Sequence, residues 1–376
     1  MPDNNVTVEN LLQNCMLAME ISKSRDYFIV NNAQLGVAAL AFAFLPLFRH
    51  RSWRHRLFTC PHNLRFIIWC AFVFHILHLF SVFVTRLHYE IVYFINHNDP
   101  CFYMSSMLKC LFFRLPYFIS IIGFTLVHVV LCVERTIATF RLSTYEKYGA
   151  TLGRTCVIVV YLVTALWSWF IFRGANLHVE RVYVSGDTRE NAERLLWMFI
   201  ATCVLDVFAT VFNFFLMLIN RSQMRVNVFN YHLSRSFQLR ENSIFLRIFL
   251  PTTIIHSAIF VLFLALNTWN RINKKSDVIH VGFFVKYEII QTLLCVDAFV
   301  TPAVFLYLRV RVASQEAQRH EHAVCALRVN SVYWKHFRAY VGTLSADADF
   351  RHNYYTPPAK SAMQDDVANL CNKHLR

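Results

Sequence analysis

Glycine and proline are scarce in this sequence of 376 residues, and charged residues are few. There are 8 glycines and 9 prolines, and Asp, Glu, Lys and Arg together make up 16% of the chain. The scarcity of turn-forming residues argues against a loop-rich secreted fold. Hydrophobic residues make up 56%, which is more apolar surface than a soluble domain can bury. The composition therefore predicts long helices in an integral membrane protein.

Motifs for catalysis and metal binding are also missing. The 11 cysteines include no C-x-x-C pair with the spacing of a zinc site. No nucleotide-binding loop, catalytic triad or paired-carboxylate site stands out. His75, His78 and His128 lie in apolar runs, but the chain lacks the His-rich clusters of membrane di-iron enzymes. We therefore expect these histidines to be hydrogen-bonded within the protein, and we predict no metal, no cofactor and no enzymatic activity.

Seven apolar runs are long enough to cross a membrane, which takes about 20 residues. They cover about 29–48, 66–85, 111–133, 155–172, 195–219, 245–266 and 283–308. The sequence therefore predicts an all-α fold, an integral membrane bundle of seven transmembrane helices over 29–308. An N-terminal segment, 1–28, would precede the bundle, and a basic tail, 309–376, would follow it.

The positive charges predict how this bundle is oriented. They lie beside the apolar runs, as in cytoplasmic flanks, so the net charge of +14 does not indicate nucleic acid as a partner. The segment 86–110, on the opposite side, carries only Arg86 and Lys109. This bias predicts an extracellular N-terminus and a cytoplasmic tail. It also places the sequon at Asn5 on the glycosylated side and the one at Asn220 in the cytoplasm.

Two adjacent charges, Glu134 and Arg135, end the third apolar run in "VHVVLCVERTIATF". At a helix end, such charges can extend to the membrane surface at little cost, so an ordinary boundary is one interpretation. A conformational switch is the other. An arginine at the mouth of a bundle can be held by a carboxylate and, once released, can meet a docking partner.

Three stretches carry a resemblance to a known family. They are "ERTIATF" followed by "YEKYG", "YHLSRSFQLRENSIFLRIFLP" over 231–251, and "NCMLAMEISKS" near the N-terminus. Together they resemble the nematode serpentine chemoreceptors of the Sra, Srab, Srb and Sre group, with class alpha/beta (Srab) preferred, although Ser236 and Phe237 stand where Arg and Tyr are usual. The resemblance covers residues 10 to about 310. It implies a chemosensory G-protein-coupled receptor in the plasma membrane of sensory cilia, with an extracellular small molecule or peptide as ligand.

The resemblance also implies roles for individual residues. Glu134 and Arg135 match the Asp/Glu–Arg–Tyr motif of rhodopsin-like receptors, with Thr136 in place of Tyr. Arg135 would then contact a heterotrimeric G protein, and Glu134 would hold it otherwise. Glu241 is a second candidate holder. With the motifs counted, the switch is favoured over the plain boundary.

The last run, "LLCVDAFVTPAVFLYLRV", resembles the Asn–Pro–x–x–Tyr region of the same receptors. Pro302 matches, and it favours a kink. Asp297 lies within the membrane segment, where a carboxylate either serves function or belongs to a structural polar network. A retinal-binding lysine is excluded, because Cys295 occupies its position. Tyr117 stands where amine receptors have an aspartate.

Arg114, Tyr117 and Glu288 are candidates for a ligand pocket at the outer end of the bundle. The alternative for Arg114 and Glu288 is an interhelical ion pair or extension to the surface. Asp206 has the same ambiguity.

Cys110 stands where rhodopsin-like receptors place a bridging cysteine, but the second outer loop has no cysteine. A disulfide of Cys15 with Cys101 or with Cys110 remains, with Cys15–Cys101 preferred, and free thiols are the alternative.

A different class of protein fits part of these data. A seven-helix ligand-gated ion channel subunit would have the opposite topology, with its N-terminus inside, and would not need the Glu134–Arg135 pair. The orientation in the membrane distinguishes the two functions.

Overall fold

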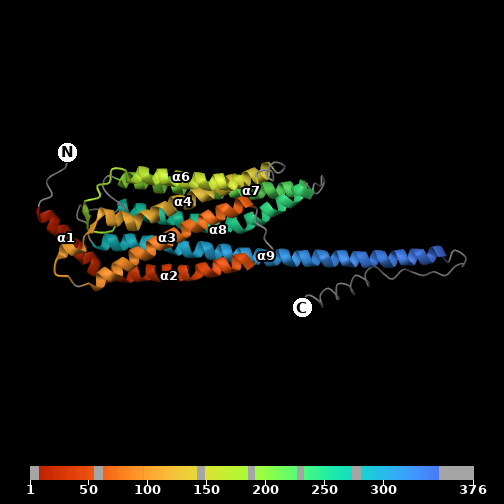
Figure 1. Ribbon diagram of the computed structural model, residues 1–376, viewed down its shortest axis with the longest axis horizontal. Coiled ribbons are helices and arrows are strands. Elements are labelled where there is room, and N and C mark those ends of the chain that lie inside the picture. The colour runs from red at the N-terminus through yellow and green to blue at the C-terminus, as the bar shows by residue number, and fades with distance from the viewer. Residues whose placement is uncertain are drawn as a thin grey trace. The chain divides into compact units, whose positions relative to one another are not determined.

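The computed structural model describes residues 8–54, 62–95, 97–141, 149–184, 191–226, 233–272 and 281–346. Within these ranges the chain is almost entirely helical. The helices are α1 (Val8–Lys23), α2 (Arg25–Arg54), α3 (His62–Phe94), α4 (Met107–Phe140), α6 (Thr151–Phe172), α7 (Ala192–Val226), α8 (Leu233–Ile272) and α9 (Val281–Ala346). The chain divides into two compact units, Met1–Arg309 and Val310–Arg376. The first unit contains the helix bundle (Figure 1), and the second contains the last part of α9.

Among the described residues, seven helices are long and apolar enough to span a membrane, which confirms the predicted seven-helix fold. The spans lie at Arg25–Phe44, Asn63–Phe94, Met107–Phe140, Thr151–Phe172, Ala192–Arg225, Gln238–Asn270 and Val281–Arg319. Most helices are longer than the predicted apolar runs. The 34 residues of α4, for example, rise about 51 Å. Hydropathy detects only the apolar part of such a helix. The helix extends beyond that part because its polar ends continue the same backbone hydrogen bonds.

The sequence did not predict α1, which precedes the first span. It has 16 residues, and one face is buried through Cys15, Ala18 and Ile21. Ser24 separates it from α2, and its hydroxyl accepts a hydrogen bond from the Tyr27 amide at 3.4 Å, as an N-cap does. In Figure 1, α1 lies at one end of the bundle, which we call the α1 end. The opposite end, at the end of α4, is the Arg135 end.

Short connecting elements close the α1 end. A 3₁₀ helix, η1 (Pro100–Tyr103), begins where Asp99 accepts a hydrogen bond from the Cys101 amide at 2.9 Å. Strand β1 (Ser105–Ser106) pairs antiparallel with β2 (Glu180–Arg181). The Met107 amide also donates to the Val179 carbonyl at 2.9 Å. These bonds fix the segment that follows α6 against the start of α4.

Helix α4 is the centre of the bundle. It packs against α3, α6, α7 and α8. In its most apolar stretch, 67% of the residues are buried, compared with 22% in the corresponding stretch of α6. Its inward residues Phe118, Ile121 and Ile122 belong to the main hydrophobic cluster. Leu166 and Trp169 of α6 are exposed, as expected of a face that meets lipid. Residues on different faces of α4 can therefore interact with α3, α6, α7 or α8.

A glycine permits the close approach of α3 and α6. The Gly153 amide donates to the Asn63 side chain at 2.9 Å. A Cβ added at Gly153 would lie 2.5 Å from the Asn63 carbonyl oxygen and 2.6 Å from its Cα. Backbone atoms cannot move aside as a flexible side chain can, so the two helices would have to separate. Small residues serve this purpose at many membrane helix contacts.

We expect Gly153→Ala to destabilise the protein by about 1–3 kcal/mol, the usual cost of overpacking. Gly36→Ala is the matched control, because a Cβ added at Gly36 meets no described atom within 4 Å. That change removes a flexible residue from a helix and should stabilise by roughly 0.4–1 kcal/mol. Thermal unfolding of the purified protein would compare them. Equal melting temperatures for the two variants would contradict the close contact.

Candidate functional site

The Arg135 guanidinium is bound within the bundle at the end of α4. Its Nε and Nη2 atoms donate to the two carboxylate oxygens of Glu134 at 2.5 and 2.6 Å. Its Nη1 donates to Asn242 Oδ1 of α8 at 3.1 Å, and its cationic centre lies 5.0 Å from the centre of the Phe245 ring. Arg135 is 2% exposed and Glu134 is fully buried. The pair is therefore part of a helix–helix contact and does not lie at a solvated boundary.

Asn242 connects this pair to the backbone of α4. Its amide nitrogen donates to Thr139 Oγ1 at 2.6 Å, and the Thr139 hydroxyl donates to the Arg135 carbonyl at 2.8 Å. The predicted second holder, Glu241, is the half-buried neighbour of Asn242 on α8. Sequence reasoning missed Asn242, although it lies in the same "REN" stretch that carries the family resemblance. Movement of α8 away from α4 would break the hydrogen bond from Arg135 to Asn242.

A second polar cluster lies midway along the bundle. Asp297 of α9 is 5% exposed and accepts a hydrogen bond from Thr301 at 2.7 Å. Its other oxygen lies 2.7 Å from His256 Nδ1 of α8. Helix α9 continues through Pro302. Asp297 thus joins α8 to α9, and His256 is a partner that sequence reasoning did not single out.

The three ligand-pocket candidates lie in a third cluster, at the α1 end. Glu288 of α9 forms buried ion pairs with Arg86 of α3 and with Arg114 of α4, the latter at 3.0 Å. The Gln34 side chain of α2 donates to the Glu288 carbonyl at 2.6 Å. Tyr117 donates to Gln291, one turn further along α9. The interhelical ion pair that the sequence left open is therefore present in the structure, with Arg86 as an additional member.

Arg114 also connects this cluster to the segment after α6. Its Nε donates to the Val184 carbonyl at 3.1 Å, and its Nη2 donates to the Tyr183 hydroxyl at 2.9 Å. Tyr183 and Val184 line a cavity of about 250 Å³ at the α1 end. Most of its other lining residues come from α1, α3 and the stretch from η1 to the start of α4, and include Ile21, His88, Tyr89, Tyr103, Met104 and Lys109. A change at the cavity wall can reach the ion pairs through Arg114.

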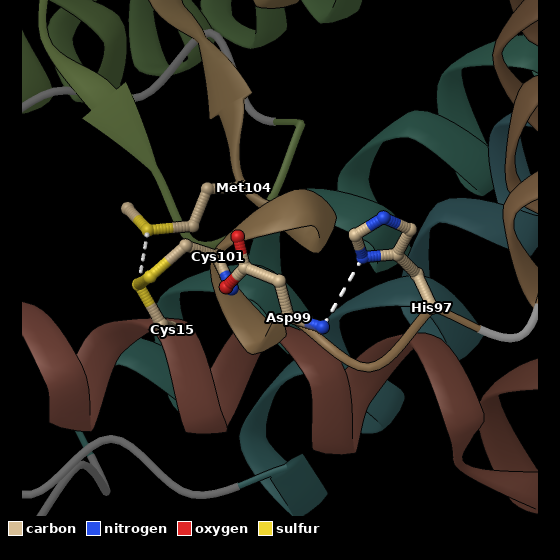
Figure 2. The surroundings of a disulfide bond; sticks show 5 residues. All are labelled: Cys15, His97, Asp99, Cys101 and Met104. Carbon is tan, nitrogen blue, oxygen red and sulfur yellow. Dashed lines mark hydrogen bonds between the residues drawn. A yellow bond between two sulfur atoms is a disulfide. The ribbon is translucent and has the colours of Figure 1, made fainter.

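Helix α1, which lines part of this cavity, is held by a covalent bond. Cys15 of α1 and Cys101 of η1 form a disulfide across 86 residues of sequence, and the Cys15 sulfur lies 3.3 Å from that of Met104 (Figure 2). Lys23 adds a second attachment, because its ammonium donates to the Tyr93 and Ile95 carbonyls at 3.0 and 2.6 Å. Cys110, the other candidate, is buried, with its sulfur 3.9 Å from the Tyr183 carbonyl. The pairing in the structure thus ties α1 to the connection between α3 and α4.

We expect Cys101→Ser to leave the Cys15 thiol reactive toward alkylating reagents in the unfolded, unreduced protein. Cys110→Ser is the matched control and should leave Cys15 protected. Loss of the cross-link should also lower stability by about 2–4 kcal/mol, the usual effect of a disulfide that closes a long loop. Mass spectrometry of the labelled peptides measures whether Cys15 is alkylated. Protection of Cys15 that is lost with Cys110→Ser and retained with Cys101→Ser would indicate the other pairing.

The two sequons differ in their surroundings. Asn5 lies outside the described residues. Asn220 is fully buried within α7, where an oligosaccharide could not be accommodated in the folded bundle.

The helix bundle and its seven candidate membrane spans agree with one family of sequences. The family described as serpentine type 7TM GPCR receptor class ab chemoreceptor matches residues 12–339. The chain belongs to this family. Class ab membership also confirms the class that the sequence motifs favoured. This class ab receptor is therefore a multi-pass membrane protein of the serpentine type.

Two similar proteins from Caenorhabditis elegans agree with this assignment. Serpentine receptor class alpha/beta-14 is 27% identical over 242 residues, which are 61% of the class ab chain and 61% of that relative. Serpentine receptor class beta-17 is 21% identical over 182 residues, or 48% and 50% of the two chains. The match thus spans less than two thirds of the length of either relative. Both relatives are named as receptors.

Proposed function

We propose that this class ab receptor is a chemosensory G-protein-coupled receptor. A ligand would bind at the α1 end from outside the cell, and a heterotrimeric G protein would bind at the Arg135 end in the cytoplasm. The observation that carries the proposal is the Arg135 contact. The guanidinium is held by Glu134 on its own helix and by Asn242 on α8. A shift of α8 would therefore change what Arg135 can contact. A ligand that binds the shifted arrangement more tightly would favour it.

The disulfide supports the orientation that this mechanism needs. Disulfides persist in oxidising compartments and are rare in the cytosol. The Cys15–Cys101 bond lies at the α1 end, so that end is expected outside. Helix α4 runs from there to Arg135, which would then face the cytoplasm. This argument does not depend on the distribution of Lys and Arg.

The cavity at the α1 end is our candidate ligand site. Its volume of about 250 Å³ is slightly below the usual range for drug-sized ligands, which suits a small molecule. Its walls are largely aromatic and apolar, with Lys109 and His88 among them. The adjoining buried cluster pairs Arg86 and Arg114 with Glu288. The lysine in the cavity wall, Lys109, favours a small, partly apolar ligand with an acidic group. By family resemblance, the receptor would act at the plasma membrane of sensory cilia.

Orientation is the first test. One epitope is placed before Met1 and another after Arg376, and antibodies are applied to intact and to permeabilised cells. Staining of only the N-terminal epitope on intact cells supports the receptor, and Asn5→Gln should then remove a glycosidase-sensitive gel shift. Staining of only the C-terminal epitope would show that Arg135 faces the outside of the cell. That result contradicts the proposal and favours the ion channel.

Coupling is the second test. The full-length protein in lipid nanodiscs is incubated with a panel of purified heterotrimeric G proteins, and receptor-dependent nucleotide exchange is measured. We expect exchange with at least one G protein, and its loss in Arg135→Ala. Arg154→Ala is the control, because Arg154 is an exposed arginine at the same end of the bundle. Equal exchange by Arg135→Ala and the wild type would contradict the role of Arg135.

A further inference from the structure

Three side chains that could ligate a metal ion meet in the middle of the bundle. His128 belongs to α4, Asp206 to α7 and His256 to α8, and one potential ligand atom from each lies within 4.8 Å of the others. His128 Nδ1 is 2.5 Å from Asp206 Oδ1, and His256 Nε2 is 3.9 Å from the same oxygen. Asp206 is fully buried, and the side chains of His128 and His256 are 12% and 7% exposed. The group connects three helices through residues at least 50 positions apart in sequence.

A second layer of hydrogen bonds orients these candidate ligands. His256 Nδ1 donates to Asp297 at 2.7 Å, and this bond leaves the lone pair of His256 Nε2 directed toward Asp206. Asp297 is itself held by Thr301, and the second oxygen of Asp206 accepts from Ser257. Metal-binding histidines almost always donate their other ring nitrogen to a carboxylate, carbonyl or water in this way.

The contact between His256 and Asp206 needs a positive charge. A distance of 3.9 Å is too long for a hydrogen bond, and a neutral imidazole would direct a lone pair at a carboxylate oxygen. Asp206 and Asp297 also bring two negative charges into the same buried cluster, and both are paired with histidines. A divalent cation between the three side chains would bond to the lone pair and balance both carboxylates. Protonation of the imidazoles is the alternative source of positive charge.

We propose that His128, Asp206 and His256 bind a divalent transition-metal cation that joins α4, α7 and α8. Two imidazoles and a carboxylate are ligands that zinc accepts, with a fourth position for water or the second carboxylate oxygen. Zinc–ligand bonds are about 2.0–2.2 Å long, so side-chain shifts of the order of an ångström bring the three atoms to bonding distance. Binding at His128 Nδ1 requires a lone pair on that nitrogen: a neutral ring then carries its proton on Nε2, and an imidazolium ring releases its Nδ1 proton to solvent. The sequence predicted no metal site, because none of its short patterns contains these three residues together.

Zinc itself is the probe in the first experiment. The full-length protein in nanodiscs is treated with EDTA, titrated with Zn²⁺ and desalted, and bound metal and melting temperature are measured. His320 and His322 are changed to Gln in every sample, because the tail sequence "HEH" could bind zinc. We expect one zinc per chain and a rise in melting temperature. His256→Asn removes one of the three proposed ligands and should lose at least about tenfold in affinity, since loss of even a supporting outer-shell group costs about 10- to 100-fold. The Asn amide can still donate to Asp297, so this variant preserves the second-layer bond.

Two further samples complete the experiment. Asp297→Asn weakens the orienting bond and removes one of the two carboxylate charges, and it should weaken zinc binding by about 10- to 100-fold. His178→Gln, at an exposed histidine, should bind like the parent. Co²⁺ in the unaltered site should give d–d absorption in the visible range, which does not depend on the folding of any variant. Equal zinc binding by the parent and His256→Asn, or the lack of such absorption, would overturn the proposal. The cluster would then be held together by protonated imidazoles alone.

Discussion

Replacing Glu288 by Ala is expected to destabilise the receptor by about 3–5 kcal/mol, the cost of breaking a buried ion pair. The substitution leaves the Arg86 and Arg114 guanidiniums with no carboxylate between them, and both residues are at most 5% exposed. Like charges in a low-dielectric interior repel each other, and water cannot screen them. The measurement is thermal unfolding of the purified protein, with the fraction of monodisperse protein on gel filtration as a second readout.

Glu193→Ala is the matched control for this prediction. Glu193 is an exposed glutamate in the first turn of α7, and changes at such positions usually stay within about 0.5 kcal/mol. Arg86→Met tests whether charge is responsible. Combined with Glu288→Ala, it should cost less than the sum of the two single changes, because it removes one of the two uncompensated arginines. Strict additivity would show that the Arg86–Glu288 pair does not contribute.

Asn242→Ala is expected to raise the ligand-independent activity of the receptor. It removes a hydrogen bond from the Arg135 guanidinium to α8, and bonds to charged groups contribute about 1.5–3 kcal/mol. Since 1.4 kcal/mol is a factor of ten in an equilibrium constant, the fraction of receptor in which Arg135 is released from α8 should grow roughly ten- to hundredfold. Basal nucleotide exchange on the G protein identified by the coupling assay would measure it. This prediction depends on the proposed function.

Asn242→Asp provides the opposite change at the same position. It places a carboxylate beside Arg135 and should strengthen the contact, so basal activity should fall below that of the wild type. Equal basal activity for the Ala and Asp variants would contradict a holding role for Asn242. Arg135→Ala remains the inactive reference in both comparisons.

The helices could be predicted from the sequence because their signal is local. A span such as 111–133 is visible as one apolar run, and membrane-spanning chains must satisfy their backbone hydrogen bonds internally, which leaves the helix as the solution. Helix α1 could not be predicted in this way. It is too short to span a membrane, and its helical structure is stabilised by burial of Cys15 and Ile21 against segments much later in the chain.

The partners of most site residues could not be predicted from the sequence either, because they are distant in the chain. Glu134 and Arg135 are adjacent and belong to a motif, so the sequence could single them out. The partner of Arg135 on α8 is 107 residues away, and Arg86 is 202 residues from Glu288. His128 and Asp206 are 78 residues apart. A single sequence shows which polar residues lie in apolar runs, but their pairing depends on how the helices are rotated and packed.

The position of the disulfide in the chain bears on the order in which the receptor is made. Both cysteines precede α4, so Cys15 and Cys101 are synthesised before most of the bundle exists. Chains fold from the N-terminus during synthesis, and oxidation can close this loop once the hairpin of α2 and α3 is inserted. Helix α4 and the helices after it would then assemble beside a segment that is already tethered. The cavity wall contributed by α1 would thus be in place before the last helix brings in Glu288.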